Sequence, residues 1–469
     1  MSAVIESRDI PISWQLVPLK ELGVWSGGGT PSKAKPEFWT NGSIPWVSPK
    51  DMKTERIIDS EDHITKAAVM ESTAKLIPEG SVLVVTRSGI LSHTLPVAIT
   101  TVPVTVNQDL KAITPKDGVL PEYVAWALRC FARKILNTCS KQGTTVASIE
   151  TAALHRFEIP LAPLDQQKRI VAEIEKQFSR LDEAVANLKR VKANLKRYKA
   201  AVLKAAVEGR LVETEAELAR REGRSYETGA QLLQRILETR RSQWQGKGKY
   251  KEPAAPDTTA LPELPDGWVW ATVDQLAVVG TGATPARGNQ QYYDGGDIPW
   301  VTSGVVNQAY IDSASEFVTP KALAETNLTL YPTGTLLVAM YGEGKTRGKC
   351  AELRISATTN QALAALQADA DVRNFLRLFL EHNYEETRKV ALGGVQPNLN
   401  LSLVRSIQVP IPPLPEQHRI TSEVDRHLSL LREIEAQVDA NLQRAQTLRQ
   451  AVLAQSFSLN PGRIGASHG

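Results

Sequence analysis

Cysteine is scarce in this 469-residue sequence, which contains only Cys130, Cys139 and Cys350. Thiols so few and so scattered cannot build a disulfide framework or a four-ligand zinc cage. We therefore expect a reducing compartment, most simply the cytoplasm. The seven histidines also lack the spacing of a helical metal site, so no metal is expected.

Long apolar runs and an excess of one charge are also missing. No uninterrupted stretch reaches the roughly 18 apolar residues of a membrane-spanning helix, so we expect no membrane partner. The sequence has 55 basic and 51 acidic residues, a net charge of +4. This balance permits nucleic-acid binding without requiring it. The length predicts two to four domains.

Recognisable catalytic motifs are absent as well. Residues 342–346, Gly-Glu-Gly-Lys-Thr, resemble the end of a phosphate-binding loop, but the first glycine of that motif would fall at Ala339. The Asn/Asp-Pro-Pro-aromatic tetrapeptide of amino-methyltransferases does not occur. We therefore predict a chain that is not itself an enzyme and holds no cofactor. A nucleotide-hydrolysing enzyme built on Lys345 remains the lesser alternative.

The sequence does contain a long internal repeat, which is the first pattern to seek in a chain of this length. Its matching segments keep their order, and their offset drifts only from 254 to 250 residues. That behaviour indicates a duplication. The pairs are Thr30-Pro31 with Thr284-Pro285, Ile-Pro-Trp-Val at 44–47 and 298–301, Asn107-Gln108 with Asn360-Gln361, and Pro-Leu-x-x-Gln-x-Arg-Ile at 163–170 and 413–420.

Each copy has two parts. The first holds short apolar runs such as residues 81–86, broken by Gly, Pro, Asn and Ser, which are typical of strands. Glycine-rich clusters at 27–29 and 280–282 indicate loops whose backbone passes close to another segment. The second part keeps a seven-residue apolar step, which predicts a coiled-coil helix beginning after Pro163 or Pro415. The steps fall at 174, 181, 188, 195 and 202, and at 424, 431, 438, 445 and 452.

The predicted fold is mixed α/β, with two similar α/β domains separated by a pair of long antiparallel coiled-coil helices in a quasi-twofold internal repeat. Parallel pairing, or dimerisation between chains, is the alternative use of the heptads. The predicted bounds are 12–162 for the first domain, 163–210 for the central helix, 211–262 for a linker with short helices, 263–412 for the second domain and 413–457 for the C-terminal helix.

Two similar domains with unlike loops suit the reading of two separated features of duplex DNA. Arg and Lys can bind guanine, and Asn and Gln adenine, through paired hydrogen bonds. A solvated surface charge is the alternative for each candidate, and Trp46 and Trp300 are expected to be core residues. The DNA-binding candidates are Lys33, Lys35, Lys50, Arg87, His93, Lys141 and Gln142 in the first copy, and Arg287, Asn289, Gln290, Lys345, Arg347, Lys349, Gln396 and Asn398 in the second.

The repeated segments, with Leu-Pro-Glu-Leu-Pro-Asp-Gly-Trp at 261–268, resemble the DNA-specificity subunit (HsdS) of type I restriction–modification systems. The resemblance covers about residues 12–457. It implies two target-recognition domains, each reading one half of an asymmetric bipartite site in double-stranded DNA with a nonspecific spacer. It also implies that the two conserved helices measure that spacer.

The resemblance further implies partners. Two methyltransferase subunits would dock on the helices, and restriction/translocase subunits would join them. S-adenosylmethionine, ATP and Mg would belong to those partners. The alternatives from other classes are a stand-alone coiled-coil DNA-binding protein and a coiled-coil scaffold without a nucleic-acid role.

Overall fold

The computed structural model describes residues 13–141, 146–245, 248–341, 346–384 and 399–457. The chain divides into two units, one formed by residues 1–190 with 438–469 and the other by residues 191–437. Both long helices contribute to both units. Each unit is described by itself below.

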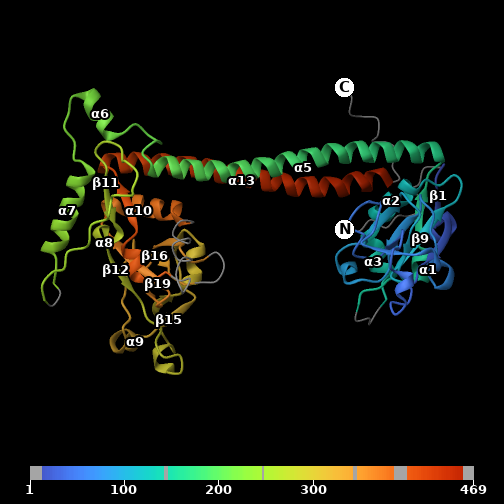
Figure 1. Ribbon diagram of the computed structural model, residues 1–469, viewed down its shortest axis with the longest axis horizontal. Coiled ribbons are helices and arrows are strands. Elements are labelled where there is room, and N and C mark those ends of the chain that lie inside the picture. Colours follow the sequence, from blue (N-terminus) through green and yellow to red (C-terminus); the bar gives the residue numbers. More distant parts are fainter. Residues whose placement is uncertain (1–12, 142–145, 246–247, 342–345, 385–398, 458–469) are drawn as a thin grey trace. The chain divides into compact units, whose positions relative to one another are not determined.

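The first unit contains a five-stranded sheet in the order β2-β9-β6-β7-β4, of which β9 is labelled in Figure 1. Its central strand β6 (Val82–Val85) is buried at all four residues, as a continuous apolar run predicts for an internal strand. The other strands of this sheet are β2 (Gly23–Gly27), β9 (Leu110–Pro115), β7 (Val97–Thr100) and β4 (Arg56–Ile57).

Two smaller sheets complete the strands of this unit. Strands β5 (Asp62–Ile64), β3 (Ile44–Val47) and β8 (Thr105–Val106) form one, and β1 (Gln15–Pro18) pairs antiparallel with β10 (Glu158–Leu161) in the other. The short helices of the unit are α1 (Lys66–Glu71), α2 (Pro121–Cys130), α3 (Ala132–Cys139) and α4 (Thr151–Arg156).

The second unit repeats this topology strand for strand. Its five-stranded sheet has the order β12-β19-β16-β17-β14, its three-stranded sheet β15-β13-β18, and β11 pairs with β20. The register repeats as well, since Trp46 lies opposite Thr105 and Trp300 opposite Thr358 in parallel pairs. The predicted duplication is therefore confirmed.

The bounds of the second unit's elements parallel those of the first. Its strands are β11 (Val269–Thr272), β12 (Ala277–Thr281), β13 (Ile298–Val301), β14 (Tyr310–Ile311), β15 (Glu316–Val318), β16 (Leu336–Ala339), β17 (Cys350–Leu353), β18 (Thr358–Thr359), β19 (Leu363–Ala368) and β20 (Gln408–Ile411). Its short helices are α8 (Val273–Leu276), α9 (Pro320–Glu325), α10 (Ala370–His382) and α12 (Leu401–Arg405).

Helices α5 (Leu164–Val207) and α13 (Leu414–Phe457) are each 44 residues long. Helix α13 begins at Leu414, so Pro415 lies in its first turn rather than before it. Proline is tolerated there because the first helical N–H groups have no intrahelical acceptor. None of the helices formed by the described residues is both long and apolar enough to span a bilayer.

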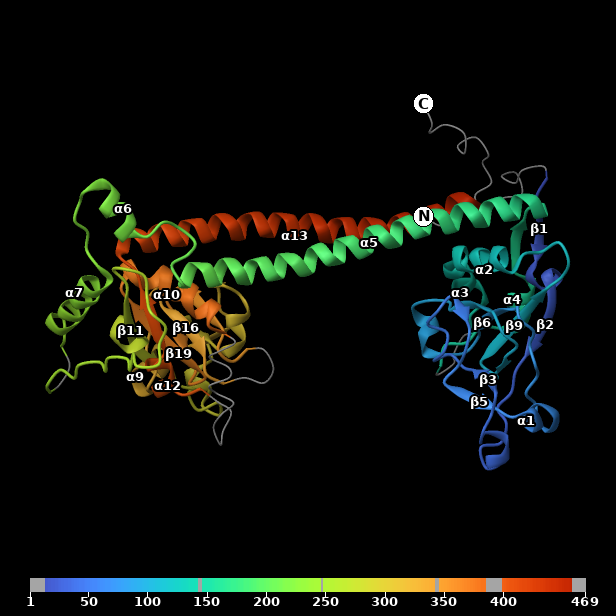
Figure 2. The same cartoon turned by 45° about the horizontal axis from the view of Figure 1, so that its top comes forward.

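The two long helices pair antiparallel. In the first unit Arg449 of α13 forms an ion pair with Asp182 of α5 at 3.0 Å. In the second unit the Tyr198 hydroxyl of α5 lies 3.1 Å from Nδ1 of His427. From the first contact to the second, the residue number rises in α5 and falls in α13. The helices therefore run antiparallel, as predicted, and parallel pairing of these helices is excluded (Figure 2).

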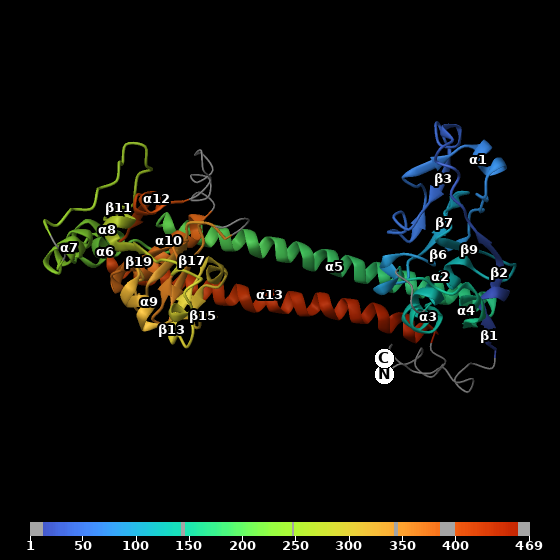
Figure 3. The same ribbon diagram turned by 90° about the horizontal axis from the view of Figure 1, so that it is seen from below.

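The segment between α5 and the second domain is packed rather than extended. It contains α6 (Glu215–Glu222) and α7 (Gly229–Ser242), each begun by a capping box. Leu232, Leu233 and Ile236 of α7 are buried in the hydrophobic core of the second unit. Helix α7 itself lies beside β11 and α8 (Figure 3). The part of the predicted linker that forms α7 therefore belongs to the second unit.

Candidate nucleic-acid interface

A buried tryptophan anchors the same loop in both units. Trp46 on β3 and Trp300 on β13 are buried, as expected for core residues. Each indole donates to a backbone carbonyl of the loop after the edge strand, Trp46 to Gly29 at 3.0 Å and Trp300 to Ala283 at 3.1 Å. The two anchored loops therefore have the same geometry.

Glycine is required where these loops cross the neighbouring strand. A Cβ on Gly28 would lie 1.7 Å from the carbonyl oxygen of Val106, and one on Gly282 would lie 1.6 Å from that of Thr359. No side chain can be accommodated at such distances. The close backbone approach predicted for the two glycine clusters is confirmed.

An exposed hydrogen bond ties each loop to the turn before the next strand. The Thr30 hydroxyl donates to Oε1 of Gln108 at 2.6 Å, and the Thr284 hydroxyl donates to Oε1 of Gln361, also at 2.6 Å. We name these the Thr–Gln pairs. Sequence reasoning did not select them as site residues, although the repeated Thr-Pro and Asn-Gln dipeptides were their signal.

Three predicted lysines of the first copy lie near this loop. Lys33 and Lys35 are exposed within it, and Lys35 lies over the Phe38 ring. Lys50 differs, because its ammonium binds Asp62 at 2.9 Å and Glu61 at 3.1 Å. Those carboxylates raise the Lys50 pKa and already neutralise its charge.

Two further candidates of the first copy lie together. Arg87 follows β6 and pairs through its backbone with Ser148, while the Lys141 N–H donates to the Ser148 carbonyl at 2.8 Å. Both side chains are exposed, so two cations share one surface. His93 is exposed at the end of the 3₁₀ turn η4 (Gly89–Ser92).

Arg287 in the second copy is exposed and held in place. It forms an ion pair with Glu316 at 2.6 Å and lies over the Trp300 ring, with the Glu316 carboxylate raising the Arg287 pKa. Asn289 caps the 3₁₀ turn η5 (Gln290–Tyr292), where exposed Gln290 begins.

The remaining DNA-binding candidates of the second copy differ in burial and in their hydrogen bonds. The Lys349 ammonium donates to Asn307 at 2.8 Å. Arg347 is buried, which does not fit an exposed reading loop. Four candidates lie outside the described residues, namely Gln142, Lys345, Gln396 and Asn398.

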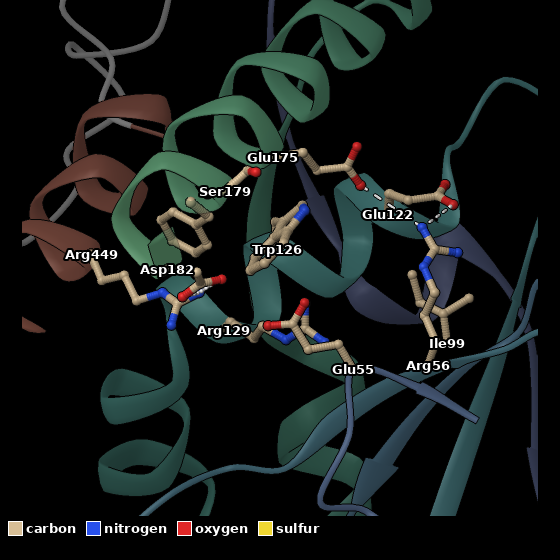
Figure 4. Close-up of a pocket in the computed structure, with 11 residues that line it drawn as sticks. Glu55, Arg56, Ile99, Glu122, Trp126, Arg129, Glu175, Ser179, Asp182 and Arg449 are labelled. Atoms are coloured by element: carbon tan, nitrogen blue, oxygen red, sulfur yellow. Dashed lines mark hydrogen bonds and ion pairs between the residues drawn. The ribbon is translucent and has the colours of Figure 1, made fainter. Parts of the chain in front are cut away.

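In the first unit, α2 meets the two long helices at a pocket of about 290 Å³ (Figure 4). Trp126 of α2 packs edge-on against Phe178 of α5, and the Arg129 guanidinium lies 4.4 Å from the Trp126 ring centroid. Arg56 approaches both Glu122 and Glu175. The acidic and basic side chains of this pocket pair with one another. The pocket is therefore a packing contact between α2 and the long helices and not a basic surface for DNA.

The tryptophan just before β1 or β11 also forms a hydrogen bond to the start of a long helix. The Trp14 indole donates to Oε1 of Gln166 at 2.7 Å. At the equivalent place Trp268 donates to Glu416 at 3.0 Å, and the backbone N–H of Glu215 donates to the other carboxylate oxygen at 2.8 Å. Burial raises the pKa of Glu416.

Glu215 holds α6 against the start of α13. Its buried carboxylate lies 2.7 Å from Arg419 and 2.6 Å from Arg224. Burial alone would raise the Glu215 pKa, but hydrogen bonds and charge from the two arginines hold it below its ordinary value. These contacts fix α6 within the second unit.

The duplicated fold and its repeated loops match a known class of DNA-recognition protein. A family model described as the type I restriction modification DNA specificity domain matches residues 11–197 and 265–444. The two matches cover more than half of the chain, which therefore belongs to this family, as the sequence resemblance predicted.

Individual relatives carry the same description. The chain is 43% identical over 182 residues to the specificity subunit of the Escherichia coli type I restriction enzyme EcoR124I/EcoR124II, a match covering 39% of this chain and 44% of that relative. It is 24% identical over 416 residues to the MjaIX specificity subunit of Methanocaldococcus jannaschii, covering 87% of this chain and 84% of the relative.

Solved structures show the same fold. The HsdS subunit from Thermoanaerobacter tengcongensis has a TM-score of 0.57 at 17% identity and covers 96% of this chain and 97% of its own. A chain from a type I restriction–modification system, solved to explain its assembly and conformational transition, has a TM-score of 0.64 at 18% identity, covering 96% and 98%.

Proposed function

We propose that this chain is the DNA-recognition subunit of a type I restriction–modification complex and reads a bipartite, asymmetric site with a nonspecific spacer. The observation that carries the proposal is the pairing of one repeated scaffold with two unlike sets of exposed side chains. Each unit has the same strand order and anchored loop. The candidate contacts differ, with Lys33 and Lys35 in the first unit and Arg287 in the second.

The division of labour follows from the chemistry of DNA recognition. Contacts to phosphates position a protein on the duplex, whereas contacts to base edges specify the sequence. Unlike loops on equal scaffolds would read two unlike half-sites. The chain itself would carry out no reaction and hold no cofactor.

The partners in this proposal are double-stranded DNA, two methyltransferase subunits and restriction/translocase subunits. The methyltransferases would supply S-adenosylmethionine chemistry and extrude the target adenine from the stack before modifying it. The restriction subunits would supply ATP- and Mg-dependent cleavage. Support for these partners is membership of the family and the printed descriptions of its relatives.

The test is a genome-wide map of N6-methyladenine in the native host with and without this chain. We expect methylation to disappear from one bipartite motif, which also reveals both half-sites and the spacer. Unchanged methylation together with no co-purifying methyltransferase would refute the proposal. It would favour a stand-alone DNA-binding protein or a scaffold.

A further inference from the structure

We propose that Gln108 and Gln361 make equivalent, sequence-independent contacts to DNA phosphates, one in each recognition domain. This inference rests on the proposed function and adds two binding residues to it. Both glutamines are exposed, and each lies in the turn that leads to the central part of its five-stranded sheet. Neither belongs to the loop residues selected from sequence.

The Thr–Gln pair orients the glutamine amide. A glutamine side chain has one acceptor oxygen and an NH₂ group with two donors. In both pairs the threonine hydroxyl occupies the oxygen, at 2.6 Å. Among the described residues, the Nε2 groups of Gln108 and Gln361 donate to no protein atom. Each pair thus presents two fixed, unused donors at the surface.

The pair is not needed to hold the loop. The Gly29 N–H donates to the Val106 carbonyl at 3.0 Å, and the Ala283 N–H donates to the Thr359 carbonyl at 2.9 Å. The tryptophan anchors add a second constraint on each loop. An exposed hydrogen bond contributes little stability because water competes for both groups. The shared register of β2 with β9 and of β12 with β19 places the pair at the same point of both units, so its exposed donors are common to both recognition domains.

The repetition indicates a feature common to both half-sites. A base contact would have to differ between two unlike half-sites, whereas every nucleotide carries the same phosphate. The charges of the first unit fit a phosphate, since exposed Lys33 and Lys35 share the loop with Thr30, whereas Arg287, which shares the loop with Thr284, is already paired with Glu316. Neutral donors beside such cations would fix register while the cations provide attraction.

The experiment uses the complex of this chain with its methyltransferase subunits. Gln108→Glu and Gln361→Glu each keep an oxygen for the threonine hydroxyl but replace the donors with a negative charge. Thr30→Val and Thr284→Val remove the hydrogen bond of the Thr–Gln pair and keep the NH₂ donors of the glutamine. Gln243→Glu is the matched control, because it makes the same charge change at another exposed glutamine.

Affinity is measured by fluorescence anisotropy for a target duplex and an unrelated duplex at fixed salt. We expect each Gln→Glu variant to bind both duplexes about tenfold more weakly or worse, because a donor to a charged phosphate is lost and a repulsion is added. The Thr→Val variants free the amide to rotate but keep its donors, so they should weaken binding to both duplexes by less than the Gln→Glu variants do. Gln243→Glu should stay within about threefold of the wild type. The methylated motif, the Tm and co-elution with the methyltransferase should not change.

Three results would overturn the inference. Wild-type affinity in both Gln→Glu variants would leave the pair with a structural role only. A changed base in the methylated motif would make the glutamine a base reader. Loss of co-elution with the methyltransferase would place the glutamine at a protein interface. Failure of the proposed function looks different, since the wild-type complex itself would then not prefer the target duplex.

Discussion

At the residue scale, the hydrogen bonds from Trp14 and Trp268 to the long helices explain why position 166 is Gln and the equivalent position 416 is Glu. Gln166 accepts one hydrogen bond, from Trp14. Glu416 accepts two, from Trp268 and from the backbone N–H of Glu215, one on each carboxylate oxygen. An amide has only one oxygen and so cannot satisfy two donors that approach from opposite sides.

This difference predicts an asymmetric result for isosteric exchange. Glu416→Gln should destabilise the protein by about 1–3 kcal/mol, because a buried N–H donor loses its acceptor. The mirror change, Gln166→Glu, keeps the oxygen that Trp14 needs and should cost less than about 1 kcal/mol. Urea unfolding of both variants measures the two free energies. Equal losses would show that the second hydrogen bond contributes nothing.

Glu215 predicts a pH dependence. Its folded-state pKa is lowered, so the stability it contributes is present above the unfolded pKa and is lost as pH falls through the folded pKa. Glu215→Gln should therefore lower stability at pH 7, by about 1–2 kcal/mol, since both arginine partners are partly exposed and screened. The gap between variant and wild type should close at acid pH.

Thermal unfolding of Glu215→Gln and wild type at several pH values between neutral and acid checks this expectation. Glu222→Gln is a matched control, because Glu222 pairs with the same Arg224 but is exposed at the other end of α6. It should change stability by less than about 0.5 kcal/mol at any pH. A gap that stays constant with pH would exclude the ion pairs as the source of the Glu215 contribution.

At the scale of elements, the apolar heptads predicted the long helices well, because a heptad position reports burial directly. All five heptad residues of α13, from Val424 to Val452, are buried. Of the five heptad residues of α5, only the end ones, Ile174 and Val202, are buried to the same degree, while Leu181, Leu188 and Leu195 are half-buried. The sequence pattern therefore overstates burial in the middle of α5, though not in α13.

Other elements could not be predicted because they depend on distant contacts. The Thr–Gln pairs join residues 78 and 77 positions apart, and they form because the antiparallel register of β2 with β9 and of β12 with β19 continues past the strand ends. The sequence places α7 in a linker with short helices, next to a Lys- and Pro-rich stretch. Its buried Leu232, Leu233 and Ile236 were the available signal for packing.

At the scale of the whole molecule, each long helix belongs to both units, since the division falls at 190/191 in α5 and at 437/438 in α13. Under the proposed function these helices measure the spacer between the half-sites. A coiled-coil pair keeps its apolar register only if residues are added in multiples of seven. An insertion of seven residues at both division points is therefore the change that tests the helices as a ruler.

Seven residues lengthen a helix by about 10 Å, which corresponds to about three base pairs of DNA. We expect the methylated motif to keep both half-sites and to gain about three base pairs of spacer, as read from a genome-wide N6-methyladenine map. Insertion into α5 alone leaves the helices mismatched and should lower the Tm without producing a new motif. A double insertion that folds, methylates and keeps the original spacer would show that helix length does not set the distance between half-sites.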